Sequence, residues 1–90
     1  MPKFVIEREL PGAGTLTPDE LHTIAAKSNQ VISDMAPRLH WLHSYVTPDK
    51  LYCVYIAEDE AAVREHAECG GFPANAVSHV ATMIDPTTGE

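Results

Sequence analysis

Five side chains of this sequence carry groups that could bind a metal ion or move a proton: His43, Tyr45, Cys53, Tyr55 and His66. Imidazole and thiolate are ligands of nickel, zinc, copper and iron. Because histidine titrates near neutral pH, the same groups could act as acid and base on a bound organic substrate. The sequence contains no Cys-x-x-Cys and no His-Glu-x-x-His motif, so spacing alone leaves both kinds of site open.

Charge and composition restrict the class of partner. The chain has 13 acidic and six basic residues and a net charge of −7 at pH 7. This balance argues against nucleic acid or an anionic membrane surface and leaves cations, small molecules and other proteins. Ninety residues predict one domain, 1–90, and no apolar stretch is long enough to cross a membrane. Two cysteines are too few for a disulfide scaffold and no secretory signal is visible, so we expect a cytoplasmic protein.

The pattern of apolar residues predicts elements in the order βαββαβ. The expected strands are residues 3–10, 39–47, 50–57 and 77–84. Thr17-Pro18-Asp19-Glu20 is typical of a helix start, and that helix must end before Pro37. Asp59 is expected to cap a second helix that ends at Gly70-Gly71. This order is that of the ferredoxin-like α+β fold, with a four-stranded antiparallel sheet in spatial order 4-1-3-2 and two helices on one face.

The turn between the second and third strands determines which side chains meet. Its proline excludes the two-residue turns that need a positive φ at that position. A type I turn over residues 47–50 with a bulge at its last residue places Tyr45 opposite Cys53 and His43 opposite Tyr55. His43 and Cys53 are then expected as diagonal neighbours on one face of the sheet. A register shift of one residue would separate them onto opposite faces.

The second helix is expected to bring His66 to this cluster. It runs back over the sheet, and His66 shares an apolar seam with Val63 and Ala67, so its ring should point at the strands. An ordinary buried histidine, hydrogen-bonded to one neighbour, is an equally good reading. His22 and His79 are expected at the surface. His40 and His43 are expected on opposite faces, because residues three apart on a strand point in opposite directions.

The sheet face without helices should contact another molecule. Neither alternating set of side chains on the two central strands is polar enough to face water. One set contains Trp41, Tyr45 and Cys53, and the other contains Leu42 and Val54. A bare apolar face marks a protein contact, and a homodimer packed sheet to sheet is the simplest form of it.

Four runs of the sequence together carry a family resemblance: His43-Ser44-Tyr45-Val46, Leu51-Tyr52-Cys53-Val54-Tyr55-Ile56-Ala57, Val63-Arg64-Glu65-His66-Ala67 and Gly70-Gly71-Phe72-Pro73-Ala74. With these runs the chain resembles a family of small bacterial proteins that was first catalogued as a domain of unknown function and whose members are often labelled nickel-binding. The resemblance implies a ferredoxin-like homodimer of the dimeric α+β barrel type. It also implies Ni²⁺ at histidine-containing sites and a role as a nickel sink.

The sequence is therefore compatible with three functions. The first is a nickel-binding protein, open to other divalent transition metals, with His43, His66 and Cys53 as ligands and Tyr45 and Tyr55 as supporting or alternate ligands. The second is a small dimeric enzyme of the monooxygenase or isomerase type, in which His43 or His66 acts as general base on an organic substrate. The third is a dimeric interaction module without a site.

Overall fold

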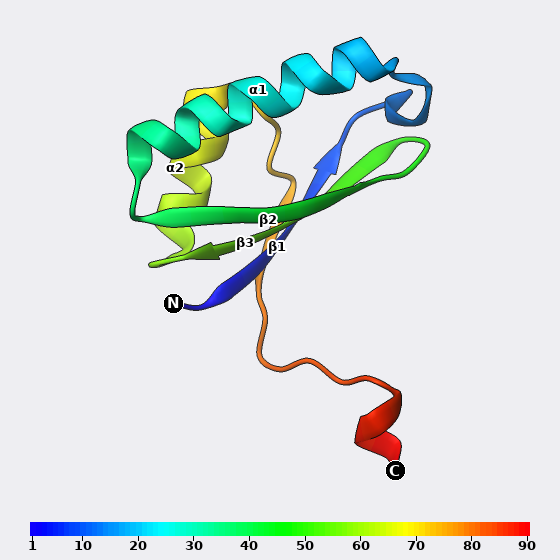
Figure 1. Cartoon of the computed structure of the whole chain (residues 1–90), viewed down its shortest axis with the longest axis vertical. Helices are drawn as coiled ribbons and strands as arrows, with labels where there is room; N and C mark the ends of the chain where they lie inside the picture. The colour runs from blue at the N-terminus through cyan, green and yellow to red at the C-terminus, as the bar shows by residue number, and fades with distance from the viewer.

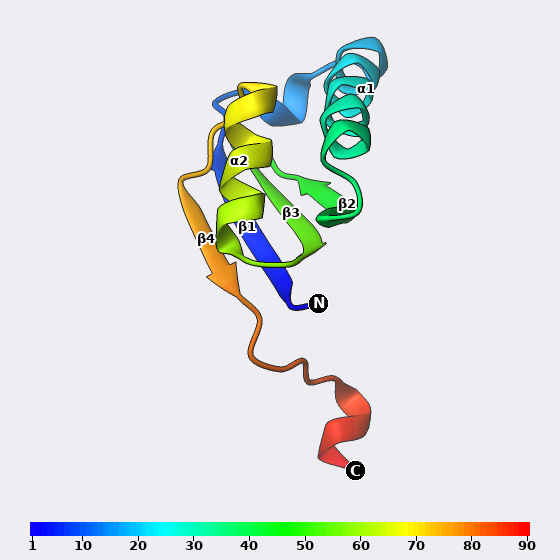
Figure 2. The same cartoon turned by 90° about the vertical axis from the view of Figure 1, so that its left-hand side faces the viewer.

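Two helices cover one face of a four-stranded antiparallel sheet in the computed structural model, which describes residues 1–90 (Figures 1 and 2). The elements are β1 (Lys3–Glu9), a short 3-10 helix η1 (Ala13–Thr15), α1 (Pro18–Met35), β2 (Leu39–Val46), β3 (Lys50–Ala57), α2 (Glu60–Gly70), β4 (Ala76–His79) and a second 3-10 helix η2 (Pro86–Gly89). The strand order is β2-β3-β1-β4. This order and the two-layer arrangement confirm the predicted ferredoxin-like α+β fold. Neither helix is long and apolar enough to span a membrane.

Both helices begin and end at the predicted signals. Thr17 and Glu20 form a capping box, in which each side chain accepts a hydrogen bond from the other residue's backbone N–H. The Asp59 carboxylate accepts the backbone N–H of Ala62 at the start of α2. Gly71 ends α2 with a φ of 69°, a left-handed conformation that favours glycine.

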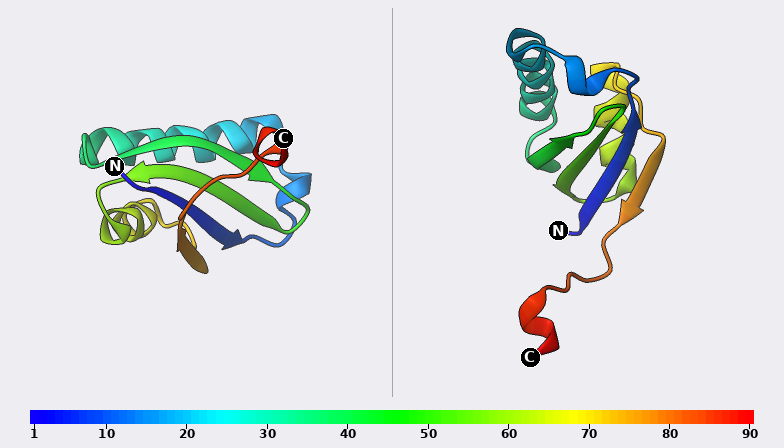
Figure 3. Two further views of the ribbon diagram at one scale, coloured as in Figure 1. Left: turned by 90° about the horizontal axis from the view of Figure 1, so that it is seen from below. Right: turned by 90° about the vertical axis from the view of Figure 1, so that its right-hand side faces the viewer.

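The core lies between the sheet and the two helices. Its ten buried residues are Phe4, Ile6, Val31, Met35, Leu39, Cys53, Tyr55, Ala57, Ala62 and Val63. Alternate residues of β1 and β3 therefore point toward the helices, as a period of two requires. The other face of the sheet carries no helix and is called the open face below (Figure 3).

The fourth strand is shorter than predicted. β4 pairs with β1 only from Ala76 to His79, and the Val80 N–H still donates to the carbonyl of Lys3. Because β1 begins at Lys3, the residues after Val80 have no strand to pair with. Residues 80–90 instead run away from the body of the domain (Figure 1), and Met83 and Ile84 are 73% and 76% exposed.

The predicted register of the β2–β3 hairpin is wrong. The Thr47 N–H donates to the carbonyl of Lys50, and Val46 pairs with Leu51, so the turn closes tighter than expected. The Thr47 hydroxyl stabilises this closure through hydrogen bonds with the backbone N–H and carbonyl of Lys50. A bulge at Leu42 then shifts the register again between Trp41 and His43.

Gly14 is a position where a side chain cannot be added without movement. Its N–H donates to the carbonyl of Pro48, so η1 packs directly on the hairpin turn. A Cβ on Gly14 would lie 2.9 Å from Cα of Pro48, a backbone atom that cannot rotate away. Gly14→Ala should therefore lower the free energy of unfolding by about 1–3 kcal/mol, as measured by urea denaturation. Gly89→Ala, where a Cβ would meet nothing within 4 Å, is the control and should change little.

Candidate functional site

The structure divides the predicted site residues between the two faces of the sheet. His43 pairs with Val54 and Tyr45 with Tyr52, so both lie on the open face. Cys53 and Tyr55 point toward the helices and are buried. The expected neighbourhood of His43 with Cys53 is therefore wrong, because the tighter turn shifts the strand pairing by one residue and places the two side chains on opposite faces. The pocket predicted to hold all five side chains does not form.

Because of the bulge at Leu42, the prediction that His40 and His43 point to opposite faces of the sheet is also wrong. His40 pairs with Ile56 and His43 with Val54, and these partners are two residues apart on β3. His40 and His43 therefore share the open face instead of pointing in opposite directions, about 6.6 Å apart along the sheet at 3.3 Å per residue. Both are exposed. The ring of His43 meets the ring of Tyr45 edge to face, with centroids 5.0 Å apart.

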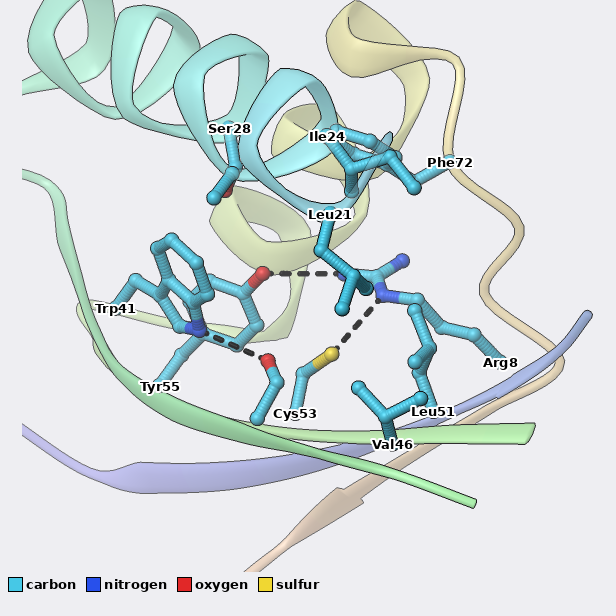
Figure 4. A pocket seen from close by; sticks show the side chains of 12 residues that line it. Arg8, Leu21, Ile24, Ser28, Trp41, Val46, Leu51, Cys53, Tyr55 and Phe72 are labelled. Atoms are coloured by element: carbon cyan, nitrogen blue, oxygen red, sulfur yellow. Dashed lines mark hydrogen bonds between the residues drawn. The ribbon is translucent and has the colours of Figure 1, made fainter. Parts of the chain in front are cut away.

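On the other face the same bulge helps to build a pocket. Trp41 and Ser44 both point toward the helices, and the Trp41 indole N–H donates to the Ser44 hydroxyl at 2.9 Å. The pocket lies between α1 and the sheet and has a volume of about 230 Å³ (Figure 4). Its lining residues are mostly apolar: Arg8, Leu21, Ile24, Ala25, Ser28, Trp41, Ser44, Val46, Leu51, Cys53, Tyr55 and Phe72.

Arg8 lines this pocket, and the sequence did not predict it as a site residue. Its side chain comes from β1 and is only 2% exposed. Nε donates to Sγ of Cys53 at 3.4 Å and Nη2 donates to the hydroxyl of Tyr55 at 3.3 Å (Figure 4). Nη1 donates to the carbonyl of Pro73. The signal was present in the alternation of β1, where Arg8 continues the inward series begun by Phe4 and Ile6.

His66 lies beside this cation and is completely buried. Its Nε2 is 3.2 Å from the hydroxyl of Ser28, and its Nδ1 has no hydrogen-bond partner. The ring packs between Tyr55 and Phe72, with centroid distances of 5.2 and 5.7 Å. Burial, reinforced by the charge of Arg8, lowers the pKa of His66 to about 4. The imidazole is therefore neutral at pH 7.

The interior cluster does not fit a metal ion. Burial raises the pKa of Tyr55, although the charge of Arg8 opposes this shift, so the phenol stays protonated near neutral pH. The Arg8 guanidinium already contacts the Cys53 sulfur and would repel a divalent cation placed there. No three histidine, cysteine or acidic side chains gather closely enough anywhere in the chain to hold a metal ion. The cluster instead contains one buried positive charge, the Arg8 guanidinium, which is surrounded mostly by apolar side chains.

The fold and its sites define a small ferredoxin-like α+β domain with one sheet face covered by helices and one open. Residues 4–80 match the family of nickel responsive proteins described as SCO4226-like, and the chain belongs to this family. No curated protein sequence matches the chain.

Solved structures share the fold. SCO4226 from Streptomyces coelicolor A3(2) superposes with a TM-score of 0.77 and is 21% identical, over 91% of this chain and 99% of that one. Rv0793 from Mycobacterium tuberculosis is 17% identical, with a TM-score of 0.45 over 96% of this chain and 99% of that chain. An antibiotic biosynthesis monooxygenase is 12% identical, with a TM-score of 0.42 over 96% of this chain and 100% of that one.

Proposed function

We propose that this protein binds nickel as a homodimer and acts as a cytoplasmic nickel sink or buffer. Membership of a family described as nickel responsive supports the choice of metal. The observation that carries the proposal is the bulge at Leu42, which aligns His40 and His43 on the open face. Imidazole nitrogen is a good ligand for Ni²⁺. The net charge of −7 favours the approach of a cation.

The open face is a better nickel site than the interior because its imidazoles are free. His40 and His43 are exposed and make no hydrogen bond through their rings to another side chain, whereas Nε2 of His66 faces Ser28 and its ring lies beside Arg8. A cation brought to His66 would lose its hydration and meet a positive charge. Lys3 lines the hollow near His43, but it is exposed and its long side chain can turn into solvent.

A second copy would complete the site. Two imidazoles are fewer than the four to six ligands that divalent nickel takes, and a twofold-related chain would add the same pair. The open face has the composition of a contact surface, since Tyr45, which is 60% exposed, lies on it together with the half-buried Val5 and Val54. The tail after β4 adds the exposed Met83 and Ile84, which a neighbouring chain could cover. Sites near the surface would also release metal readily, as a buffer requires.

Nickel titration of histidine variants tests this proposal. His43→Ala and His40→Ala should each weaken nickel binding at least tenfold, or about 1.4 kcal/mol, in calorimetry with tag-free protein. His22→Ala is the matched control, because His22 is exposed on α1, in the helix layer on the other side of the sheet from the open face. Wild-type affinity in His43→Ala, together with lost binding in His66→Gln, would contradict the open-face site.

Nickel binding should also release protons. Only neutral imidazole coordinates a metal, so protons compete with nickel for the ligand nitrogens. The affinity should therefore fall as the pH decreases, by at least tenfold between pH 7.5 and 5.5. Calorimetry at the two pH values measures this change. Equal affinities would rule out histidine ligation.

A further inference from the structure

Arg8 is a buried cation without a counter-charge. All ion pairs of the chain involve other basic residues, Arg38, Lys50 and Arg64, which are partly exposed. Arg8 is 2% exposed and contacts a thiol, a phenol hydroxyl and a backbone carbonyl instead. A buried charge normally needs a charged partner, because desolvation costs several kcal/mol. This site therefore lacks the anion that would balance it.

The guanidinium has unused hydrogen-bonding capacity at the pocket. Arginine carries five N–H groups, and the three hydrogen bonds to Cys53, Tyr55 and Pro73 leave two of them without a partner. Tyr55 and Phe72 hold the guanidinium from the sides, with its carbon 6.0 and 5.6 Å from the two ring centroids. Arg8 itself lines the pocket beneath α1 (Figure 4). A planar anion could thus meet a donor that is already fixed in place.

The other residues that line the pocket favour a ligand with an apolar part. Leu21, Ile24 and Ala25 of α1 face Trp41 and Val46 of β2 across the pocket. A cavity of about 150 Å³ holds benzene, so about 230 Å³ would hold roughly nine non-hydrogen atoms by proportion. Such a ligand is a small organic acid and not an inorganic ion, because an ion alone would leave the apolar walls uncovered.

We propose that this pocket binds a small organic monocarboxylate, with its carboxylate on Arg8 and an aromatic or short acyl body between α1 and β2. The ligand supplies the counter-charge that the fold lacks and fills the apolar volume. The neighbouring groups do not compete for this role, since no acidic side chain lines the pocket. The site lies on the helix side of the sheet and is independent of the proposed nickel site on the open face.

Binding of benzoate and benzamide to metal-free protein tests the proposal. The two probes have nearly the same shape and differ in charge. Benzoate should bind saturably in an NMR titration and at least tenfold more tightly than benzamide. Arg8→Met should lose this preference. Because the comparison of the probes uses the unmodified protein, it stands even where Arg8→Met does not fold.

A variant that fills the pocket tests whether benzoate binds inside it. Ala25→Phe should abolish benzoate binding, because Ala25 lines the pocket. Ala26→Phe is its matched control, since Ala26 is exposed on α1 and outside the pocket, and it should bind benzoate like the wild type. Inorganic phosphate should not displace benzoate at equal concentration. Equal affinity for the two probes, no benzoate binding, binding that survives Ala25→Phe, or displacement by phosphate would each overturn the proposal.

Discussion

Lowering the pH from 7.5 to 5.0 should reduce the free energy of unfolding by about 2 kcal/mol through His66 alone. The pKa of His66 is about 4 in the folded protein and 6.5 in the unfolded chain. Between these values the unfolded chain binds more protons than the folded one. The stability that comes from keeping His66 neutral is therefore complete above pH 6.5 and is lost as the pH falls toward 4.

Urea denaturation of wild type and His66→Gln at the two pH values measures this effect. The variant cannot titrate and should lose about 2 kcal/mol less than the wild type between pH 7.5 and 5.0. Hydrogen bonds lower the pKa values of the surface carboxylates Glu20 and Asp85. Both proteins contain these carboxylates, so their effect on the pH dependence of unfolding cancels in the difference. The protein concentration must be the same throughout, because unfolding of a dimer depends on it. His22→Gln, at an exposed position, should behave like the wild type. The same pH dependence in wild type and His66→Gln would contradict this account of the buried ring.

Val54→Asp should convert the proposed dimer to a monomer. Val54 lies on the open face between Val5 and His43, its neighbours on β1 and β2. A carboxylate that loses its water in this contact costs several kcal/mol, so the dimer should dissociate at least 100-fold more readily. Light scattering at micromolar concentration should then report one chain of 9.8 kDa in place of two.

The fold of the single chain should survive this change. Val54 is only half-buried and lies on the face without helices, so the circular dichroism spectrum should match that of the wild type. Ser33→Asp introduces the same charge at an exposed position of α1 and should remain dimeric. A wild-type protein that is already monomeric, or a Val54→Asp variant that remains dimeric, would exclude the open face as the interface.

Local signals in the sequence were sufficient for the fold. The capping box at Thr17, the Asp59 cap and the left-handed Gly71 are decided by a few neighbouring residues, and all three are found as predicted. The strand order follows from the sequence of elements, because few topologies satisfy a βαββαβ chain. The residue at which β4 ends could not be predicted from local signals. It depends on where β1 begins, which lies some 75 residues earlier in the chain.

The arrangement of the site depended on details that have no local signal. The bulge at Leu42 has no glycine or proline to mark it, yet it reverses the direction of every side chain before it relative to those after it. It brought His40 onto the same face as His43, whereas the tighter turn had already moved His43 away from Cys53. Arg8 was visible in the alternation of β1, but a charged residue at the end of a strand is usually exposed, and only the packing of Phe72 and Tyr55 around it reveals its burial.

A crystal structure of nickel-soaked protein with anomalous scattering at the nickel edge tests the central claim most directly. We expect an anomalous peak about 2.1 Å from an imidazole nitrogen of His40 or His43 on the open face, a typical distance from a first-row metal to an imidazole nitrogen. We expect no peak between His66 and Cys53, where the Arg8 guanidinium lies. A peak inside the domain at His66, with none at His40 or His43, would contradict an open-face nickel site.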